Sequence, residues 1–159
     1  MTASPDQYTT RVAPAWIDYN GHLRDGYYTV VFSCAIDALM DRLGLDEAYR
    51  RATHCTLYTL ELHVHFLHEV TATDELTVRW RVLDADHKRL HVALEMYSAQ
   101  RPAPAASAEF MLLHVRQGEA PAAAEFPAEI AAAIEALRVA AAANPEVSPG
   151  SRKIGLRRH

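Results

Sequence analysis

The sequence predicts an α+β fold in which a five-stranded antiparallel sheet wraps around one long, buried helix. Three observations predict it. The segment 27–43 is apolar on nearly every side of a helical wheel, four segments with strand character follow it, and one short segment precedes it. A helix of this kind needs cover around most of its girth. We therefore expect a curved sheet that encloses it rather than a flat one.

The helices are marked by their end signals. The long helix stops at Gly44, which suits a left-handed terminal residue. Asp46 then opens a short second helix in "LDEAYRRA". From Pro127 the chain is rich in alanine, with apolar residues at helical spacing, until an Asn-Pro pair at 144–145. We expect a C-terminal helix there that docks on the rest of the domain.

The strands are marked by period-two alternation. In "TLELHVHF", residues 59–66, Leu, Val and Phe alternate with Thr, Glu and His. The runs 75–83 and 89–97, joined by "DADHK", predict an antiparallel hairpin. Another strand is expected at 107–116, and a short first strand around 9–12. A strand, a buried helix and four antiparallel strands, in that order, are typical of the hotdog fold.

Length and composition indicate one domain over residues 1–144 and a basic, flexible tail over 145–159. The net charge of -4 excludes a broad nucleic-acid-binding surface, so no nucleic acid is expected as a partner. Two cysteines without paired spacing predict neither a disulfide framework nor a zinc site. The start lacks a secretion signal, and no stretch reaches the roughly 18 apolar residues of a membrane span. We expect a cytoplasmic protein that does not bind membranes.

A five-stranded enveloping sheet leaves unpaired edges and an open face. Pairing of two copies covers both, so a homodimer or homotetramer is expected, with ligands bound between subunits.

The densest chemistry lies in "WIDYNGHLRDGYY", residues 16–28, just before the long helix. If that helix begins near Asp25 or Gly26, its first amides lack intrahelical partners and suit a carbonyl oxygen that gains negative charge. Asp18 is close enough in sequence to attack an acyl carbon or to activate a water. Asn20 and His22 are candidates to orient that water. A simpler interpretation is an Asx turn at Asp18 with a helix cap at Asp25.

The segment "WIDYNGHLRDGYYTVVF" resembles the D-x-x-G-H-x-N-x-x-Y signature of the hotdog-fold acyl-CoA thioesterases, the group that includes the 4-hydroxybenzoyl-CoA enzymes. The resemblance implies that Asp18 is the general base or nucleophile and that the Asp25 or Gly26 amide is the oxyanion donor. It implies no cofactor and no metal. The sequence departs from the pattern where an Asn is usual, because Arg24 and Asp25 stand there.

Further blocks, "YTLELHVHFLHEV" and "RVLDADHKRLH" among them, are similar to the betainyl-CoA branch of that family, which acts in carnitine catabolism. Such a substrate carries a trimethylammonium group, which aromatic rings and a carboxylate can hold. Expected substrate-binding residues are Trp16, Tyr19, Tyr27, Tyr28, Glu61 and His63. Expected partners of the CoA phosphates are Lys88 and Arg89.

Four alternatives stay open. Another acyl-CoA, short-chain or aromatic, is the first, and a hotdog hydratase or dehydratase is the second. The third is a non-catalytic acyl-CoA-binding module. The fourth takes His63, His65 and Glu69 as a cupin-like metal strand, although a cupin barrel needs about eight strands. A serine hydrolase is disfavoured because no G-x-S-x-G elbow is present.

Overall fold

The structure, a computed structural model, describes residues 6–143. The expected basic tail at 145–159 lies outside the described residues, and the predicted domain boundary at 144 is not tested.

The sheet is antiparallel throughout and follows the order β1-β3-β4-β5-β2. Its long strands are β1 (Gln7–Arg11), β2 (Cys55–Phe66), β3 (Glu75–Ala85), β4 (Arg89–Ser98) and β5 (Pro104–Arg116). All five predicted strands are therefore present, and the hotdog architecture is confirmed. A two-residue strand, β6 (Ala122–Ala123), adds to β5. Two alanines show no alternation, so their sequence gives no strand signal.

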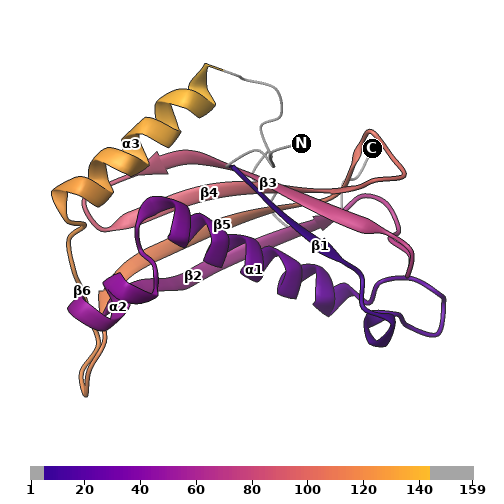
Figure 1. The fold of residues 1–159 in the computed structure, drawn as a ribbon, viewed down its shortest axis with the longest axis horizontal. Helices are drawn as coiled ribbons and strands as arrows, with labels where there is room; N and C mark the ends of the chain where they lie inside the picture. Colours follow the sequence, from indigo (N-terminus) through magenta and orange to yellow (C-terminus); the bar gives the residue numbers. More distant parts are fainter. Residues whose placement is uncertain (1–5, 144–159) are drawn as a thin grey trace, which may run out of the picture.

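The long helix, α1 (Asp25–Leu43), runs along one face of the curved sheet (Figure 1). It packs against β1 and β3 and buries Phe32 and Leu39 completely. Gly44 ends the helix in the left-handed region, at φ 85°. The short helix α2 (Glu47–Thr53) follows, with the Asp46 carboxylate accepting a hydrogen bond from the Tyr49 amide at 2.8 Å. Both end signals were thus predicted correctly.

The C-terminal helix, α3 (Ala128–Ala142), lies over the end of β3 near the C-terminus of α1 (Figure 1). Ile130 and Ile134 are buried there. A short 3-10 helix, η1 (Pro14–Trp16), precedes the loop that leads into α1. No helix within residues 6–143 is long and apolar enough to cross a membrane.

The expectation that α1 is buried around most of its girth holds, except along one stripe of the helix. A stripe of Gly26, Val30, Ser33, Asp37 and Asp41 is exposed. Its last three members are polar and mark the stripe in the sequence, whereas Gly26 and Val30 do not. The stripe is uncovered because α1 lies toward the β1–β3 half of the sheet and leaves the β2 half less covered.

Exposed apolar side chains gather on the opposite edge of the sheet. β2 pairs with β5 and has no second neighbour among the described strands. Tyr58 and Leu60 of β2 are 38% and 56% exposed, and Phe66 and Leu67 at its end are 55% and 49% exposed. An edge strand with exposed apolar side chains favours pairing with another chain.

Candidate active site

The loop between η1 and α1 is a tight turn built around Asp18. Ile17 and Leu23 form an isolated antiparallel bridge. Inside it, the Asp18 amide donates to the His22 carbonyl at 2.8 Å, and the Gly21 amide donates to the Asp18 carbonyl at 3.0 Å. Gly21 has φ 80°, which glycine adopts without steric cost. The loop therefore holds Asp18 in a fixed position ahead of α1.

The Asp18 carboxylate takes part in its own turn. Its Oδ1 accepts hydrogen bonds from the Asn20 amide at 2.8 Å and from the His22 amide at 3.3 Å. Oδ2 accepts neither of these two amides. Desolvation raises the pKa of Asp18, but the hydrogen bonds from Asn20 and His22 outweigh it and hold the pKa below the usual aspartate value. Asp18 is thus ionised at neutral pH, and the Asx turn is compatible with a chemical role because one oxygen remains outside the turn.

A cavity of about 530 Å³ opens beside this loop at the N-terminus of α1. It lies between the loop and the segment that follows β2. The two segments are tied together by a hydrogen bond from the Leu23 amide to the Val70 carbonyl at 2.7 Å. The lining residues are Asp18, Tyr19, His22, Leu23, Arg24, Asp25, Tyr28, Phe66, Leu67, His68 and Glu69.

The first amides of α1 differ in their availability. The Tyr27 amide donates to the Arg24 carbonyl at 2.9 Å, and the Gly26 amide donates to the Asp25 Oδ1 at 2.8 Å. The Asp25 amide has no acceptor within residues 6–143. The Asp25 N–H is therefore the amide that is open to a carbonyl oxygen, while the Gly26 N–H becomes open only when the Asp25 carboxylate turns away.

The structure brings five of the sequence-predicted residues to this cavity: Asp18, Tyr19, His22, Asp25 and Tyr28. Asn20 contributes through its contact with Asp18. Trp16 and Tyr27 do not line it. Their rings stack on each other, 5.3 Å apart and 16° from parallel, and pack against the core.

Glu61 and His63 lie elsewhere. The His63 Nε2 is 2.8 Å from the Glu61 Oε1, and both line a different, smaller cavity with His91 and Glu109. Glu69 lies in the large cavity instead, away from His63. Within the described residues, no group of three or more His, Cys, Asp or Glu side chains is arranged to hold a metal ion.

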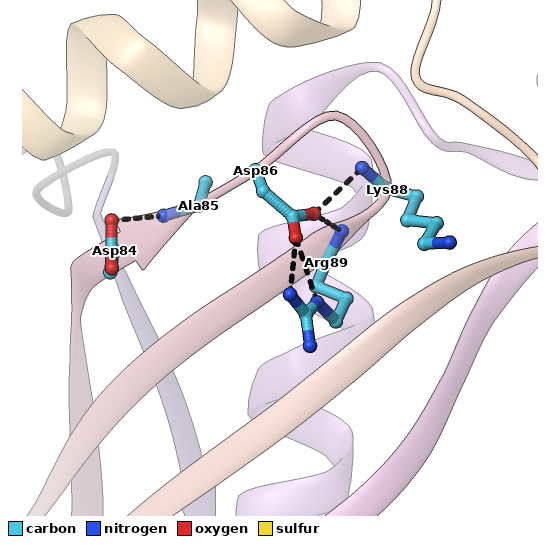
Figure 2. Close-up of polar contacts among 5 residues, drawn as sticks. All are labelled: Asp84, Ala85, Asp86, Lys88 and Arg89. Atoms are coloured by element: carbon cyan, nitrogen blue, oxygen red, sulfur yellow. Dashed lines mark hydrogen bonds and ion pairs between the residues drawn. The ribbon is translucent and has the colours of Figure 1, made fainter.

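Lys88 and Arg89 lie at the β3–β4 turn, at the other end of the sheet from the α1 N-terminus (Figure 1). The Asp86 carboxylate accepts hydrogen bonds from the backbone amides of both residues and from the Arg89 side chain, as Figure 2 shows. The Lys88 amide and the Arg89 side chain hold the pKa of Asp86 far below its usual value. The Lys88 ammonium points away from Asp86 (Figure 2) and makes no ion pair within residues 6–143.

Sequence reasoning missed Arg24 on the loop side of the cavity and the whole far wall, which is formed by residues 66–69. The Phe66 ring meets the Tyr28 ring edge to face at 5.2 Å, and the Tyr28 hydroxyl donates to the His68 carbonyl at 3.3 Å. The sequence signal that could have pointed to this wall is the polar pair His68 and Glu69, directly after the alternation of β2 ends. Nothing local to that pair shows that it meets the Asp18 loop.

A hotdog fold with an ionised carboxylate and an open helix N-terminus on one cavity suits a thioesterase, and the comparisons with known proteins show that class. The chain belongs to the thioesterase-like superfamily, which matches residues 12–134. It is 46% identical to the betainyl-CoA thioesterase of Pseudomonas aeruginosa, over 94% of this chain and 93% of that one. It is also 33% identical to the L-carnitine dehydrogenase/betainyl-CoA thioesterase of Rhizobium meliloti, over 94% of this chain and 30% of that one.

Solved structures agree with this family. A thioesterase-type protein of Pseudomonas putida KT2440 superimposes with a TM-score of 0.81 at 36% identity, covering 95% of this chain and 96% of that one. A Staphylococcus aureus protein solved in complex with CoA gives a TM-score of 0.85 at 26% identity, covering 99% and 100%.

Proposed function

We propose that the protein hydrolyses a small, cationic acyl-CoA thioester, betainyl-CoA, to betaine and free CoA. The observation that carries this proposal is the cavity that joins the ionised Asp18 to the open N-terminus of α1. The similarity to the P. aeruginosa betainyl-CoA thioesterase over nearly the whole of both chains supports the acyl group. Three alternatives compete with this proposal: a different acyl-CoA substrate, hydration of an enoyl-CoA, and binding of acyl-CoA without turnover.

The chemistry follows from the geometry. The thioester carbonyl oxygen accepts the Asp25 N–H, where the helix dipole stabilises the negative charge that develops on it. Asp18 takes a proton from water, and the resulting hydroxide adds to the carbonyl carbon. The tetrahedral intermediate expels the CoA sulfur as the C–S bond breaks, and the proton returns from Asp18 to the thiolate. Direct attack by Asp18 is the competing route and gives a mixed anhydride that water then opens.

A thiol-release assay tests the activity. Purified protein should release free CoA from betainyl-CoA with a kcat/KM at least tenfold above that for acetyl-CoA. A hydratase would convert an enoyl-CoA without releasing thiol, and a binding module would bind CoA esters without turnover. A wild-type protein that releases no thiol from any small acyl-CoA refutes the proposed activity.

We further propose that two copies pair through their β2 edges. The exposed Tyr58 and Leu60 and the exposed stripe of α1 that contains Val30 then become buried. In such a twofold, antiparallel pairing, the N-terminal end of one β2 lies beside the C-terminal end of the other. Each cavity would then lie at an end of the continuous sheet, and that end would contain strands of both copies.

Leu60→Lys should convert the dimer to a monomer. A charge at the centre of an edge strand opposes strand pairing and desolvation at the interface. Val139→Lys is the matched control, because Val139 on α3 is also 56% exposed and lies away from β2. The molar mass from light scattering should halve for Leu60→Lys and stay unchanged for Val139→Lys. A wild-type monomer, or a Leu60→Lys variant of unchanged mass, contradicts this assembly.

The pairing gives Lys88 a role that it cannot have within one chain. Residue 55 of β2 pairs with residue 116 of β5, and Arg89 pairs with Leu113 nearby, so the β3–β4 turn lies at the N-terminal end of β2. In the pair, the partner subunit's Lys88 therefore lies at the same end of the joined sheet as this chain's cavity. Its unpaired ammonium suits the CoA phosphates.

Lys88→Ala should raise KM for acyl-CoA roughly fivefold, as expected for one exposed charge contact, and leave kcat unchanged. The same acyl group on N-acetylcysteamine, which has no phosphates, should show no change. Lys88→Arg should keep the wild-type KM because the charge is retained. An equal loss on both thioesters would show that Lys88 does not meet the nucleotide.

A further inference from the structure

We propose that Glu69, together with the edge-to-face pair of Tyr28 and Phe66, forms the subsite that selects a quaternary ammonium group at the acyl end of the substrate. This inference rests on the proposed thioesterase function and names the residues that set its substrate class. It replaces the sequence expectation, which placed that role on Glu61 and on rings that include Trp16 and Tyr27.

The charge of the cavity favours a cationic acyl group. Three carboxylates line it, those of Asp18, Asp25 and Glu69, against one guanidinium, that of Arg24. An acyl chain that ends in a carboxylate would add a fourth negative charge to this space. A fixed positive charge on the acyl group is attracted by the same carboxylates.

The three carboxylates are not equivalent. Asp18 accepts the amides of its own turn, and Asp25 accepts the Gly26 amide. Glu69 has neither a hydrogen bond nor an ion pair within residues 6–143. Of the three carboxylates, only that of Glu69 is therefore not already hydrogen-bonded to a backbone amide of the described residues.

The aromatic pair lies beside Glu69. Tyr28 is 4% exposed, and its hydroxyl is anchored on the His68 carbonyl, so the ring has a fixed orientation. Phe66 meets it at 5.2 Å. Desolvation raises the pKa of Tyr28 most, and the negative charge of Glu69 raises it further. The Glu69 carboxylate is therefore close enough to Tyr28 for its charge to be felt there. A trimethylammonium group has no N–H to donate, and aromatic faces with a nearby carboxylate are the surroundings that hold it.

The spacing along α1 suits a short acyl group. Tyr28 is three residues after Asp25, so the two lie on the same face of the helix, about one turn apart. If the carbonyl oxygen accepts the Asp25 N–H, an acyl group of a few atoms places its end near the Tyr28 ring. Betainyl has this length, since one methylene separates its carbonyl from its nitrogen.

Glu61 is not placed to perform this role in the same chain. It lies outside the large cavity and is hydrogen-bonded to His63 at 2.8 Å. The two glutamates thus give a direct choice between the sequence expectation and the structural assignment.

The test compares two thioesters that differ in one atom. Betainyl-CoA carries N⁺ where 3,3-dimethylbutanoyl-CoA carries a quaternary carbon, so size and shape are matched and only the charge differs. Glu69→Gln should lower kcat/KM for betainyl-CoA about tenfold and leave 3,3-dimethylbutanoyl-CoA within twofold of wild type. Glu69→Asp should keep most of the preference for the charged substrate. Glu129→Gln, a substitution at an exposed glutamate on α3, which packs on β3 and not on β2, controls for the change in net charge.

The outcomes are separable. If wild type prefers betainyl-CoA and Glu69→Gln keeps that preference, the Glu69 subsite is refuted while the thioesterase function stands. A loss of preference in Glu61→Gln instead of Glu69→Gln also refutes it. If wild type cleaves the uncharged isostere as well as betainyl-CoA, both the subsite and the proposed substrate fall, but the thioesterase activity remains. Phe66→Leu should weaken the same preference without changing the uncharged substrate, which tests the aromatic wall.

Discussion

Asp18→Asn should lower kcat for thioester cleavage about 10³-fold while the protein stays folded. The substituted side chain keeps a carbonyl oxygen that can accept the Asn20 and His22 amides, so the turn is preserved. It loses the negative charge, and an amide neither takes a proton from water nor attacks a thioester. The measurement is the initial rate of thiol release at saturating substrate, with the melting temperature as a check on folding.

Asp46→Asn is the matched control. Asp46 also uses its carboxylate to accept a backbone amide, that of Tyr49 at 2.8 Å, but it caps α2 outside the cavity. Its substitution should leave kcat unchanged. An Asp18→Asn variant with kcat within fivefold of wild type would remove Asp18 from the mechanism.

The pH dependence follows from the ionisation of Asp18. Desolvation raises its pKa, but the hydrogen bonds from Asn20 and His22 outweigh this, and the pKa lies below the usual aspartate value. The reactive carboxylate is lost only as the pH falls through that lowered value. The rate should therefore stay flat from neutral pH down to the ordinary pKa of aspartate, and an acid limb near pH 6 would point to a different base.

A single turnover in H₂¹⁸O tests for direct attack by Asp18, because heavy oxygen on the Asp18 carboxylate arises only by that route. Water activation places the heavy oxygen in the carboxylate product during that turnover. Direct attack gives an anhydride, and water that opens it at the Asp18 carbon leaves the heavy oxygen on the enzyme. Mass spectrometry of the product and of the Asp18 peptide distinguishes these results.

Local signals predicted the parts of the site that are local in sequence. The start of α1 at Asp25, its stop at Gly44 and the turn at Asp18 each depend on neighbours within a few residues, and the structure has all three. The position of residues 66–69 depends on a contact between the Leu23 amide and the Val70 carbonyl. No periodicity or motif reports such a contact, so in the sequence Glu69 enters only the metal-strand alternative, together with His63 and His65.

Strand alternation also assigns a side chain to a face but does not tell which face meets the cavity. Glu61 and His63 were correctly placed on one face of β2, and the structure shows that they line the smaller cavity with His91 and Glu109. The register between β2 and β5 shifts between Thr59 and Glu61, where one residue is inserted. A bulge of this kind changes which side chains share a face and has no clear sequence marker here.

Asp74→Ala should lower the free energy of unfolding by about 3 kcal/mol, because the buried Ser98 hydroxyl and the part-buried Thr71 amide would lose their acceptor. Asp74 is 4% exposed and closes the turn between β2 and β3. Its Oδ1 accepts the Ser98 hydroxyl at 2.6 Å, and its Oδ2 accepts the Thr71 amide at 2.6 Å. The carbonyl of Val70, which precedes this turn, accepts the Leu23 amide of the loop before α1. Loss of Asp74 thus weakens the support behind the cavity as well as the core.

Denaturant unfolding measures the effect, with Asp84→Ala as the control. The exposed Asp84 accepts its neighbour's amide at the surface, and its substitution should change stability by less than about 0.5 kcal/mol. Desolvation raises the pKa of Asp74, but the Ser98 and Thr71 hydrogen bonds outweigh it and lower the pKa. The stability that the ionised carboxylate contributes is therefore present above the ordinary aspartate pKa and is lost as the pH falls through the folded-state value.

Asp74→Asn should therefore flatten the fall in stability at acid pH. If the fall is unchanged in this variant, carboxylates other than Asp74 cause it.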